Sequence, residues 1–369
     1  VLLQAGRKSR DMVVGEVDEG MAAFRGDTGQ RLWSNTAKYG GPCILHGESI
    51  ITDRYAYHLL SGEQILRRDP LTGAEEPWAY TRQYGCAYAV ASENLLTFRS
   101  AAGGYYDLAN DGGTGNFGGF KAGCTSNLIA ANGVLNAPDY TRTCSCSYPN
   151  QTSLALVHMP GVEQWVTYFG SSGEGPLQRV GINLGAPGNR RAPDGRFWIA
   201  YPLLPYIDNP EKESGLAVAV AVEASEDGFY TRHVSSTSGA LNWVAASGCR
   251  GIERLEVPLN QQGAALCQVD LVFAEPDYER AGRRLIDIRI EGEIVLRGLD
   301  IFAEAQGRNR ALVKSFGDIA VTDGAVTVEL APGTPVVEAM GTHAAVAETA
   351  QPVLSGLAVS AQDLATASH

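Results

Sequence analysis

The sequence lacks any hydrophobic run of 18 residues and any block of clustered lysine and arginine. The first absence means that no transmembrane segment is predicted. The second, together with a net charge of −12, makes nucleic acid a poor partner, because phosphate binding needs a concentrated basic surface. No signal peptide is visible, but the chain starts at Val1 without a methionine, so we expect further sequence to precede it.

The common catalytic and metal-binding motifs are also absent. There is no Gly-x-Ser-x-Gly or His-Glu-x-x-His segment and no Cys-x-x-Cys pair, and the six histidines stand singly. The 41 acidic residues are too many for spacing to select a carboxylate pair that would cleave a glycosidic bond. The sequence predicts no catalytic residue and no metal site, and it favours a protein that is not an enzyme.

Cysteine is the reactive residue type that recurs. Seven are present, and five fall within the first 150 residues. Disulfides formed in an oxidising compartment explain them best, which would place the protein in the periplasm or outside the cell. A reduced, buried set and a metal or redox site are the alternatives, and the spacing does not define the pairing. The disulfide candidates are Cys43, Cys86, Cys124, Cys144 and Cys146.

The composition is that of a folded chain with many turns. Hydrophobic residues make up 44% and charged residues 19%, which excludes a disordered chain. The 43 glycines and 17 prolines indicate tight turns between short strands. A length of 369 residues accommodates two domains of ordinary size.

Two repeats run through the first 140 residues. In the first, a Thr-Gly or Ser-Gly pair stands between an alanine and a large apolar residue. We predict a strand, a turn in which glycine takes a positive φ, and a returning strand whose large residue packs against a neighbour. The positions are Ala23, Thr28, Gly29 and Trp33 in one copy, and Ala56, Ser61, Gly62 and Leu66 in the other.

The second repeat begins at a Gly-Cys or Gly-Pro-Cys element. A short apolar strand, a polar turn and another apolar strand follow, at residues 41–51, 85–96 and 123–135. The cysteines recur after 43 and 38 residues. A period near 40 with several short strands is typical of propeller blades.

The first repeat resembles the tryptophan-docking motif of quinoprotein (PQQ-like) β-propellers, although Arg25 stands where that family usually has aspartate. The segments 98–108, 115–119 and 144–154 look like the end of a large bacterial group of PQQ-like repeat proteins. The resemblance covers about residues 12–160 and implies three to four blades before residue 165. A closed propeller needs at least about four blades, so we expect earlier blades to be missing.

The same resemblance bears on cofactors. Quinoprotein dehydrogenases carry adjacent cysteines beside the quinone, with acidic and asparagine ligands to calcium. This sequence has no Cys-Cys pair, and Cys144-Ser145-Cys146 is not equivalent. We therefore predict no cofactor, and quinone and calcium are without support.

Alternating apolar residues predict strands in the second half of the chain. Residues 266–273 place Cys267, Val269, Leu271 and Phe273 on one face. Residues 287–296 form a hairpin candidate with its turn at Glu291-Gly292. Residues 326–330 alternate again, and residues 353–359 are expected to be a closing strand.

Five short motifs in this half resemble a malectin domain. They are residues 273–277, 284–292, 299–302, 309–311 and 352–356. The resemblance covers about residues 178–361 and implies a jelly-roll-like β-sandwich related to carbohydrate-binding modules. The predicted organisation is a partial propeller at 1–165, a linker at 166–177, the malectin-like sandwich at 178–361 and a tail at 362–369.

Sugars are held by aromatic rings and by planar polar side chains. Tyr230, His233 and Trp243 fall in or near a predicted loop of the second domain and are the candidate ligand contacts. The alternative is that Phe229 and Trp243 pack in the core. Three residues of the malectin-like motifs are expected to hold loops rather than ligand: Asp277, Asn309 and Arg310.

Three functions follow. The favoured one is a noncatalytic exported binding protein, in which the malectin-like domain recognises carbohydrate and the propeller is a scaffold. The second is a cell-envelope scaffold with protein partners, since fold alone does not fix function. The third is a fragment of a quinone-dependent dehydrogenase whose active site lies in preceding sequence.

Overall fold

The structure is a computed structural model. It describes residues 2–6, 20–37, 42–82, 85, 88–118, 120, 128–138, 153–157, 159, 163–166, 175–202, 218–225, 227–261, 263–333 and 350–362. Every described element of more than five residues is a β-strand, so the predicted all-β class is confirmed. The chain forms two compact units: residues 1–68 with 74–170, and residues 69–73 with 171–369.

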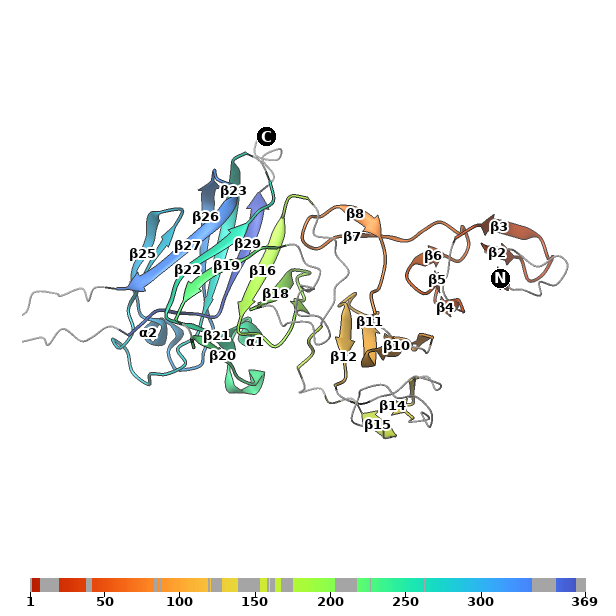
Figure 1. The fold of residues 1–369 in the computed structure, drawn as a ribbon, viewed down its shortest axis with the longest axis horizontal. Coiled ribbons are helices and arrows are strands. Elements are labelled where there is room, and N and C mark those ends of the chain that lie inside the picture. Colours follow the sequence, from red (N-terminus) through yellow and green to blue (C-terminus); the bar gives the residue numbers. More distant parts are fainter. Residues whose placement is uncertain are drawn as a thin grey trace, which may run out of the picture. The chain divides into compact units, whose positions relative to one another are not determined.

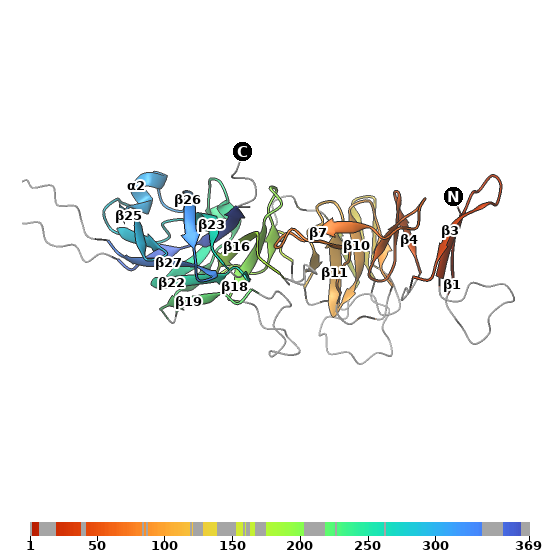
Figure 2. The ribbon, with the colours of Figure 1, turned by 90° about the horizontal axis from the view of Figure 1, so that it is seen from above.

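The first unit consists of small antiparallel sheets in which strands that follow one another in the chain are paired. Figure 2 shows them as short, separate sheets. The sheets are β1 (Leu2–Gly6), β2 (Gly20–Phe24) and β3 (Arg31–Asn35); β4 (Ile44–His46), β5 (Ser49–Ile51) and β6 (Ala56–His58); β7 (Leu66–Arg68) and β8 (Glu75–Pro77); β9 (Val90–Ala91), β10 (Leu95–Ser100), β11 (Ala102–Asp107) and β12 (Thr114–Asn116); and β13 (Ile129–Ala131), β14 (Val134–Ala137) and β15 (Leu154–Val157).

The turns of the first repeat have the predicted geometry. Gly29 and Gly62 both have φ of 72°, a conformation that glycine adopts without a steric penalty. Each turn is closed in the same way, because Thr28 Oγ1 accepts a hydrogen bond from the amide two residues later and Ser61 Oγ does likewise, both at 3.3 Å. Ala23, at the start of the first copy, is fully buried.

Trp33 packs against the next copy of the repeat, as predicted. Its indole Nε1–H donates to the carbonyl oxygen of Leu59 at 2.9 Å. The ring lies on the backbone of Gly62, where an added Cβ would come within 2.5 Å of the indole. A side chain at position 62 would displace the ring, so the turn glycine serves both the positive φ and the contact with Trp33.

Leu66 does not take the equivalent place, and that prediction was wrong. Its side chain is 54% exposed. The corresponding tryptophan is Trp78, which follows a third turn of the same kind at Thr72-Gly73, where Gly73 also has φ of 72°. Trp78 Nε1–H donates to Asp111 Oδ1 at 3.1 Å. One additional residue between turn and tryptophan hid this copy from a fixed-spacing comparison.

All three copies of the Gly-Cys repeat contain the predicted hairpin. The pairs are β4 with β5, β9 with β10, and β13 with β14. Cys43, at the start of the first copy, is a free thiol whose Sγ lies 3.6 Å from Met21 Sδ. Burial raises its pKa to about 11, so it is protonated at neutral pH. The other disulfide candidates, Cys86, Cys124, Cys144 and Cys146, lie outside the described residues.

These sheets do not close into a ring within the described part of the first unit. The sequence of short up-and-down sheets is what a propeller requires, but closure is its defining feature. The partial propeller therefore remains a prediction.

The second unit is built on two large sheets, which Figure 1 shows packed against each other. The six-stranded sheet has the order β17-β18-β16-β29-β23-β26, the five-stranded sheet β19-β22-β27-β24-β25, and a small sheet β20-β21-β28. The bounds are β16 (Arg179–Leu184), β17 (Arg190–Arg191), β18 (Phe197–Tyr201), β19 (Ala221–Ala224), β20 (Phe229–Thr231), β21 (Ser247–Arg250), β22 (Ile252–Pro258), β23 (Ala265–Phe273), β24 (Ile286–Ile290), β25 (Glu293–Leu299), β26 (Leu312–Val321), β27 (Ala325–Pro332), β28 (Val353–Leu354) and β29 (Gly356–Gln362).

The core follows the predicted alternation. From Cys267 onward every second residue of β23 is fully buried, and so is every second residue of β24. The predicted hairpin joins β24 to β25, and both turn residues, Glu291 and Gly292, have positive φ (52° and 77°), as a two-residue type I′ turn demands. The buried residues of β23 are Cys267, Val269, Leu271 and Phe273.

The predicted closing strand is divided at Ser355. β28 joins the small sheet, whereas β29 lies between β16 and β23 in the six-stranded sheet. Ser355 donates its amide to Val272 O at 2.9 Å, and its carbonyl accepts from Leu184 N at 2.9 Å. The break costs no backbone hydrogen bond at Ser355 and lets one segment tie two sheets together.

Residues 69–73 pack as part of the second unit. Leu71 is fully buried, and its carbonyl oxygen accepts from Gln178 N at 2.7 Å and Arg179 N at 3.0 Å. Asp69 Oδ1 holds this turn by accepting from the amides of Leu71 and Thr72 at 2.8 and 2.9 Å. A fragment that begins at residue 171 would lack this part of the core, so experiments on the second unit need the whole chain.

Replacing Trp33 by alanine should lower the free energy of unfolding of the first unit by about 2 to 3 kcal/mol. This lies below the range for a fully buried tryptophan, because the ring is only half-buried. Leu66→Ala is the control and should change stability by less than about 0.5 kcal/mol. Urea unfolding followed by circular dichroism measures both, and equal effects would contradict the assignment of Trp33 as the docking residue.

Candidate functional site

The outer face of the five-stranded sheet carries solvent-exposed ion pairs. On the five-stranded sheet, Arg254 pairs with Glu256 at 3.0 Å and Glu329 at 3.6 Å. The six-stranded sheet differs, because its Arg196–Asp270 pair at 3.3 Å is largely covered, with the two side chains 12% and 13% exposed. The described strands of the five-stranded sheet contain no aromatic residue. A flat row of rings, on which a sugar chain would stack, is therefore absent from this face as described.

A different surface lies at one end of the sandwich, where the connecting segments gather (Figure 1). We call it the loop end and define it as residues 230–241, 275–285 and 300–311. It includes a 3-10 turn η1 (Val234–Ser236) and a short helix α2 (Ile301–Ala305). Backbone hydrogen bonds join the three segments: Asn309 N donates to Glu275 O at 3.0 Å, and Ala311 N donates to Ser238 O at 2.8 Å.

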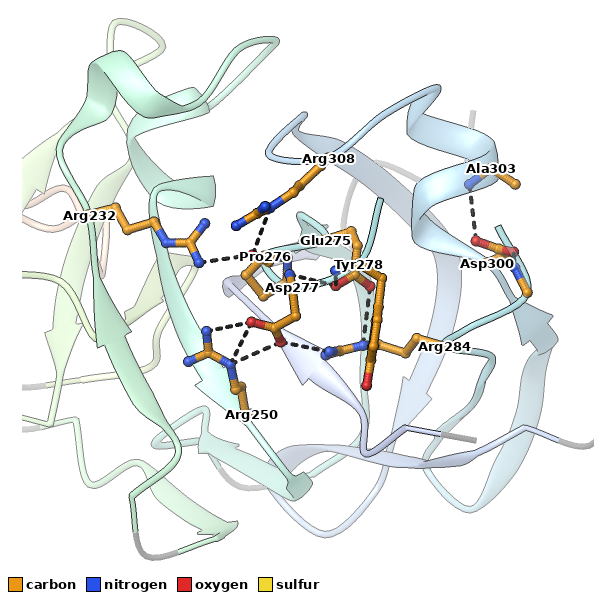
Figure 3. Close-up of polar contacts among 11 residues, drawn as sticks. Arg232, Arg250, Glu275, Pro276, Asp277, Tyr278, Arg284, Asp300, Ala303 and Arg308 are labelled. Atoms are coloured by element: carbon orange, nitrogen blue, oxygen red, sulfur yellow. Dashed lines mark hydrogen bonds and ion pairs between the residues drawn. The ribbon is translucent and has the colours of Figure 1, made fainter. Parts of the chain in front are cut away.

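Arginine side chains reinforce these backbone contacts. Arg232 donates to Asn309 Oδ1 at 2.6 Å and to Pro276 O at 2.9 Å. Arg308 donates to the same carbonyl of Pro276 at 3.0 Å (Figure 3). Two guanidinium groups from different segments thus converge on one carbonyl oxygen, and each segment is fixed relative to the other two.

Glu275 and Asp277, on either side of this proline, anchor the middle segment. Glu275 is 1% exposed; it pairs with Arg284 (Nε–Oε2, 3.2 Å) and accepts the amides of Asp277 and Tyr278 at 2.9 and 3.1 Å. Arg284 also reaches Asp277 Oδ2 at 2.8 Å. Burying a carboxylate is costly unless it is paired and hydrogen-bonded, and Glu275 is both.

Asp277 extends the network to strand β21. Arg250 donates to both of its carboxylate oxygens at 2.8–3.2 Å (Figure 3). Burial alone would raise the pKa of Asp277, but the hydrogen bonds and charges of Arg250 and Arg284 outweigh it and hold that pKa below its ordinary value. Asp277 is therefore an anion held between two cations at neutral pH.

Two tyrosines are part of the same construction. The guanidinium carbon of Arg250 lies 4.3 Å from the ring centroid of Tyr230, and that of Arg232 lies 5.5 Å away. Arg283 and Arg284 lie 5.4 and 5.3 Å from the ring centroid of Tyr278. Cations within about 6 Å of a ring centroid are attracted to it, so both rings are held in place by arginine.

The structure separates the three predicted ligand residues. Burial raises the pKa of Tyr230 to about 12, and its ring lies beside Arg250, so Tyr230 supports the loop end from within. Trp243, in α1 (Asn242–Ala245), is 7% exposed and packs edge-on against Trp198 at 5.6 Å. Trp243 thus occupies a core position, which was the alternative considered for it. His233 is exposed and caps η1, where its Nδ1 accepts from Ser235 N at 3.2 Å.

The three motif residues expected to hold loops do so. Asp277 and Asn309 accept hydrogen bonds from arginines of other segments, and Arg310 donates to Gln306 O at 3.0 Å. Sequence reasoning missed Arg232, Arg250 and the half-buried Tyr278. Arginine next to an aromatic residue, as in Tyr-x-Arg at 230–232, was the signal available, but it does not say which loop the guanidinium reaches.

The described residues provide neither a metal-type cluster nor an exposed cysteine at this surface. No group of three or more histidine, cysteine, aspartate or glutamate side chains arranged for a metal is present among them. Cys249 and Cys267 are free and buried, and burial raises the pKa of each to about 11. In the part of the chain described, no helix is long and apolar enough to cross a membrane.

Comparison with known families confirms part of the resemblance. Residues 256–356 match the malectin domain. The match spans the middle segment of the loop end, α2 and the strands from β23 to β28. It does not extend to the first unit. A search of curated proteins finds no match.

Solved structures give distant likenesses. A Bacteroides uniformis β-glucuronidase is 14% identical with a TM-score of 0.35, over 50% of this chain and 18% of that one. The complex of the plant peptide RALF23 with FER and LLG2 is 12% identical with a TM-score of 0.34, over 49% of this chain and 48% of that one. The ANXUR1 extracellular domain from Arabidopsis thaliana is 10% identical with a TM-score of 0.34, over 50% of this chain and 48% of that one. This chain thus spans less than half of each, and at these scores the likenesses do not bear on function.

Glu275→Gln should destabilise the second unit by about 3 kcal/mol. Removing one member of a buried ion pair costs about 3 to 5 kcal/mol, and the lower value applies because the amide oxygen can still accept the two backbone amides. Glu279→Gln is the control, since that side chain is 80% exposed in its pair with Arg308, and it should cost less than about 0.5 kcal/mol. Equal losses in urea unfolding would contradict the buried-pair assignment.

The stability of the second unit should fall on acidification in a way that depends on Asp277. A carboxyl whose folded-state pKa is lowered contributes stability above its unfolded-state value of about 3.9, and the contribution disappears as the pH falls through the folded-state pKa. Thermal unfolding from about pH 6 to about pH 3 should therefore show a shallower decline for Asp277→Asn than for the natural protein. Parallel declines would show that Asp277 is not responsible.

Proposed function

We propose that this chain is a noncatalytic binding protein whose second unit recognises carbohydrate at the loop end and whose first unit is a propeller-type scaffold. The observation that carries the proposal is the malectin-domain match at residues 256–356. The matched residues supply two of the three segments that the arginine network holds together, 275–285 and 300–311. A surface that is fixed before the ligand arrives spends less free energy on ordering when it binds.

The chemistry of the exposed groups at the loop end supports a sugar ligand. His233, Ser235 and Ser236 are exposed on one segment, and Tyr278 presents a half-buried ring on the next. Imidazole and hydroxyl groups hydrogen-bond to sugar hydroxyls, and an aromatic ring packs against the C–H face of a pyranose. Arg232 bonds to Pro276 O and so keeps these two segments adjacent.

Two observations support the scaffold role of the first unit. Its sheets are short, and Trp33 and Trp78 link them through hydrogen bonds to Leu59 O and Asp111 Oδ1. Repeated contacts of this kind hold neighbouring sheets together. The proposal includes export, to the periplasm or outside the cell, where polysaccharides are exposed.

An interaction scaffold with protein partners is the second candidate, and one observation favours it. Eight large hydrophobic side chains are exposed among the described residues, and all belong to the first unit. Exposed apolar groups of this kind mark protein contact surfaces when they are contiguous. They are Leu32, Leu45, Leu60, Leu66, Tyr88, Ile129, Val157 and Met159.

Glycan-array screening of the whole chain tests the carbohydrate proposal. Tyr278→Ala should weaken binding to any glycan found by about threefold to tenfold, which corresponds to the loss of an aromatic contact of about 0.5 to 1.5 kcal/mol. His233→Ala should also weaken it. Tyr88→Ala, at a 49% exposed tyrosine of the first unit, is the matched control and should have no effect.

Circular dichroism and thermal unfolding must show that each variant is folded. A folded protein that binds no glycan would overturn the carbohydrate proposal and leave the protein-scaffold candidate in its place. Glycan binding that is equally sensitive to Tyr88→Ala would place the site outside the loop end.

A further inference from the structure

The charges of the loop end do not balance, although the chain as a whole is acidic. The residues of the loop end and Arg250 together provide seven arginines against five carboxylates, in a chain with a net charge of −12. Three of the carboxylates are consumed by the arginine network, namely Glu275, Asp277 and Glu279. Glu304 pairs with Lys314 outside the loop end.

Four of the arginines have no carboxylate partner within the described residues. Arg232 and Arg310 donate only to neutral acceptors. Arg280 and Arg283 are exposed, and neither forms an ion pair. The one carboxylate of the loop end without an ion pair is Asp300, which accepts the amides of Ala303 and Gly282 instead. The loop end therefore presents uncompensated positive charge.

The placement of one of these arginines, Arg283, is specific. Arg280 and Arg283 belong to the same short segment as Tyr278, and the guanidinium carbon of Arg283 lies 5.4 Å from the ring centroid of Tyr278. The segment is rigid, because Glu275 accepts two of its amides and Arg284 pairs with Glu275 beneath it. An aromatic ring and one exposed guanidinium group, that of Arg283, are thus held side by side, and the exposed Arg280 follows Tyr278 by two residues in the chain.

From this juxtaposition we infer that the ligand of the loop end is an anionic glycan, with a carboxylate-bearing sugar placed against Tyr278 and its carboxylate met by Arg283 and Arg280. The inference rests on the proposed carbohydrate function and narrows its ligand class. Guanidinium groups match carboxylates in charge and in planar geometry, whereas a neutral sugar offers them hydroxyl acceptors but no opposite charge.

The test uses the whole chain and a matched pair of probes. One is a glucuronate-containing oligosaccharide, and the other is the same oligosaccharide with its carboxylates reduced to primary alcohols. Isothermal titration calorimetry should show binding of the acidic form that weakens as salt is raised, and binding of the reduced form that is about tenfold or more weaker.

The variants locate the effect. Arg280→Gln with Arg283→Gln should weaken binding of the acidic form by about tenfold and binding of the reduced form by less than about threefold. Arg289→Gln is the control, since Arg289 is an exposed arginine at the far end of β24, beside the turn at Gly292. It should change neither. Thermal unfolding should be unaffected, because both loop arginines are exposed.

The other outcomes separate this inference from the broader proposal. Equal binding of both oligosaccharides would overturn the anionic class and leave carbohydrate recognition intact. Binding of neither by the folded protein would remove both. Equal binding of polyglutamate, which has carboxylates but no sugar, or equal loss with Arg289→Gln, would reveal unspecific ionic attraction and overturn the glycan assignment.

Discussion

Glu275 is nearly inaccessible to water, and a carboxylate in that position is stable only when another group supplies what water would have given it. Arg284 provides the charge, and the amides of Asp277 and Tyr278 provide the hydrogen bonds. These hydrogen bonds fix the path of the chain after β23, because the two amides belong to residues two and three positions after Glu275. The buried ion pair therefore determines the conformation of the turn that follows β23, and with it the positions of the exposed side chains on that turn.

The constraint spreads because each arginine has more donors than a single carboxylate uses. Arg284 serves Glu275 and Asp277, and Arg250 brings strand β21 to Asp277 from the other side. Arg232 then ties the segment after β20 to Pro276 and Asn309. The planar guanidinium groups of these arginines fix the relative positions of the segments more tightly than flexible lysine ammonium groups would. The first unit solves a similar problem with indole rings, since Trp33 and Trp78 each reach a polar acceptor beyond their own hairpin.

Patterns that depend on neighbours in the chain were readable from the sequence. The alternation of β23, the type I′ turn at Glu291-Gly292 and the glycine turns at Gly29 and Gly62 are all local, and all were predicted correctly. Contacts between distant segments were not readable. The prediction that Leu66 packs inward was wrong, because spacing alone does not show which large residue faces the neighbouring sheet. Trp243 was a candidate ligand contact, but the fold buries it against Trp198. Arg250 and Asp277 are 27 residues apart, a distance that no periodicity covers.

The position of the positive charge decides what it can do. At physiological ionic strength, exposed charges more than about 8 Å apart are largely screened from one another, so the net charge of −12 repels a distant polyanion only weakly and Arg280 and Arg283 attract it only on contact. Long-range steering is thus a poor explanation for free arginines on this surface. A short-range role requires a second contact group beside the arginines. The Tyr278 ring, which lies next to Arg283, is such a group. One buried ion pair, Glu275 with Arg284, thus holds the segment that carries both the positive charge of Arg283 and the Tyr278 ring.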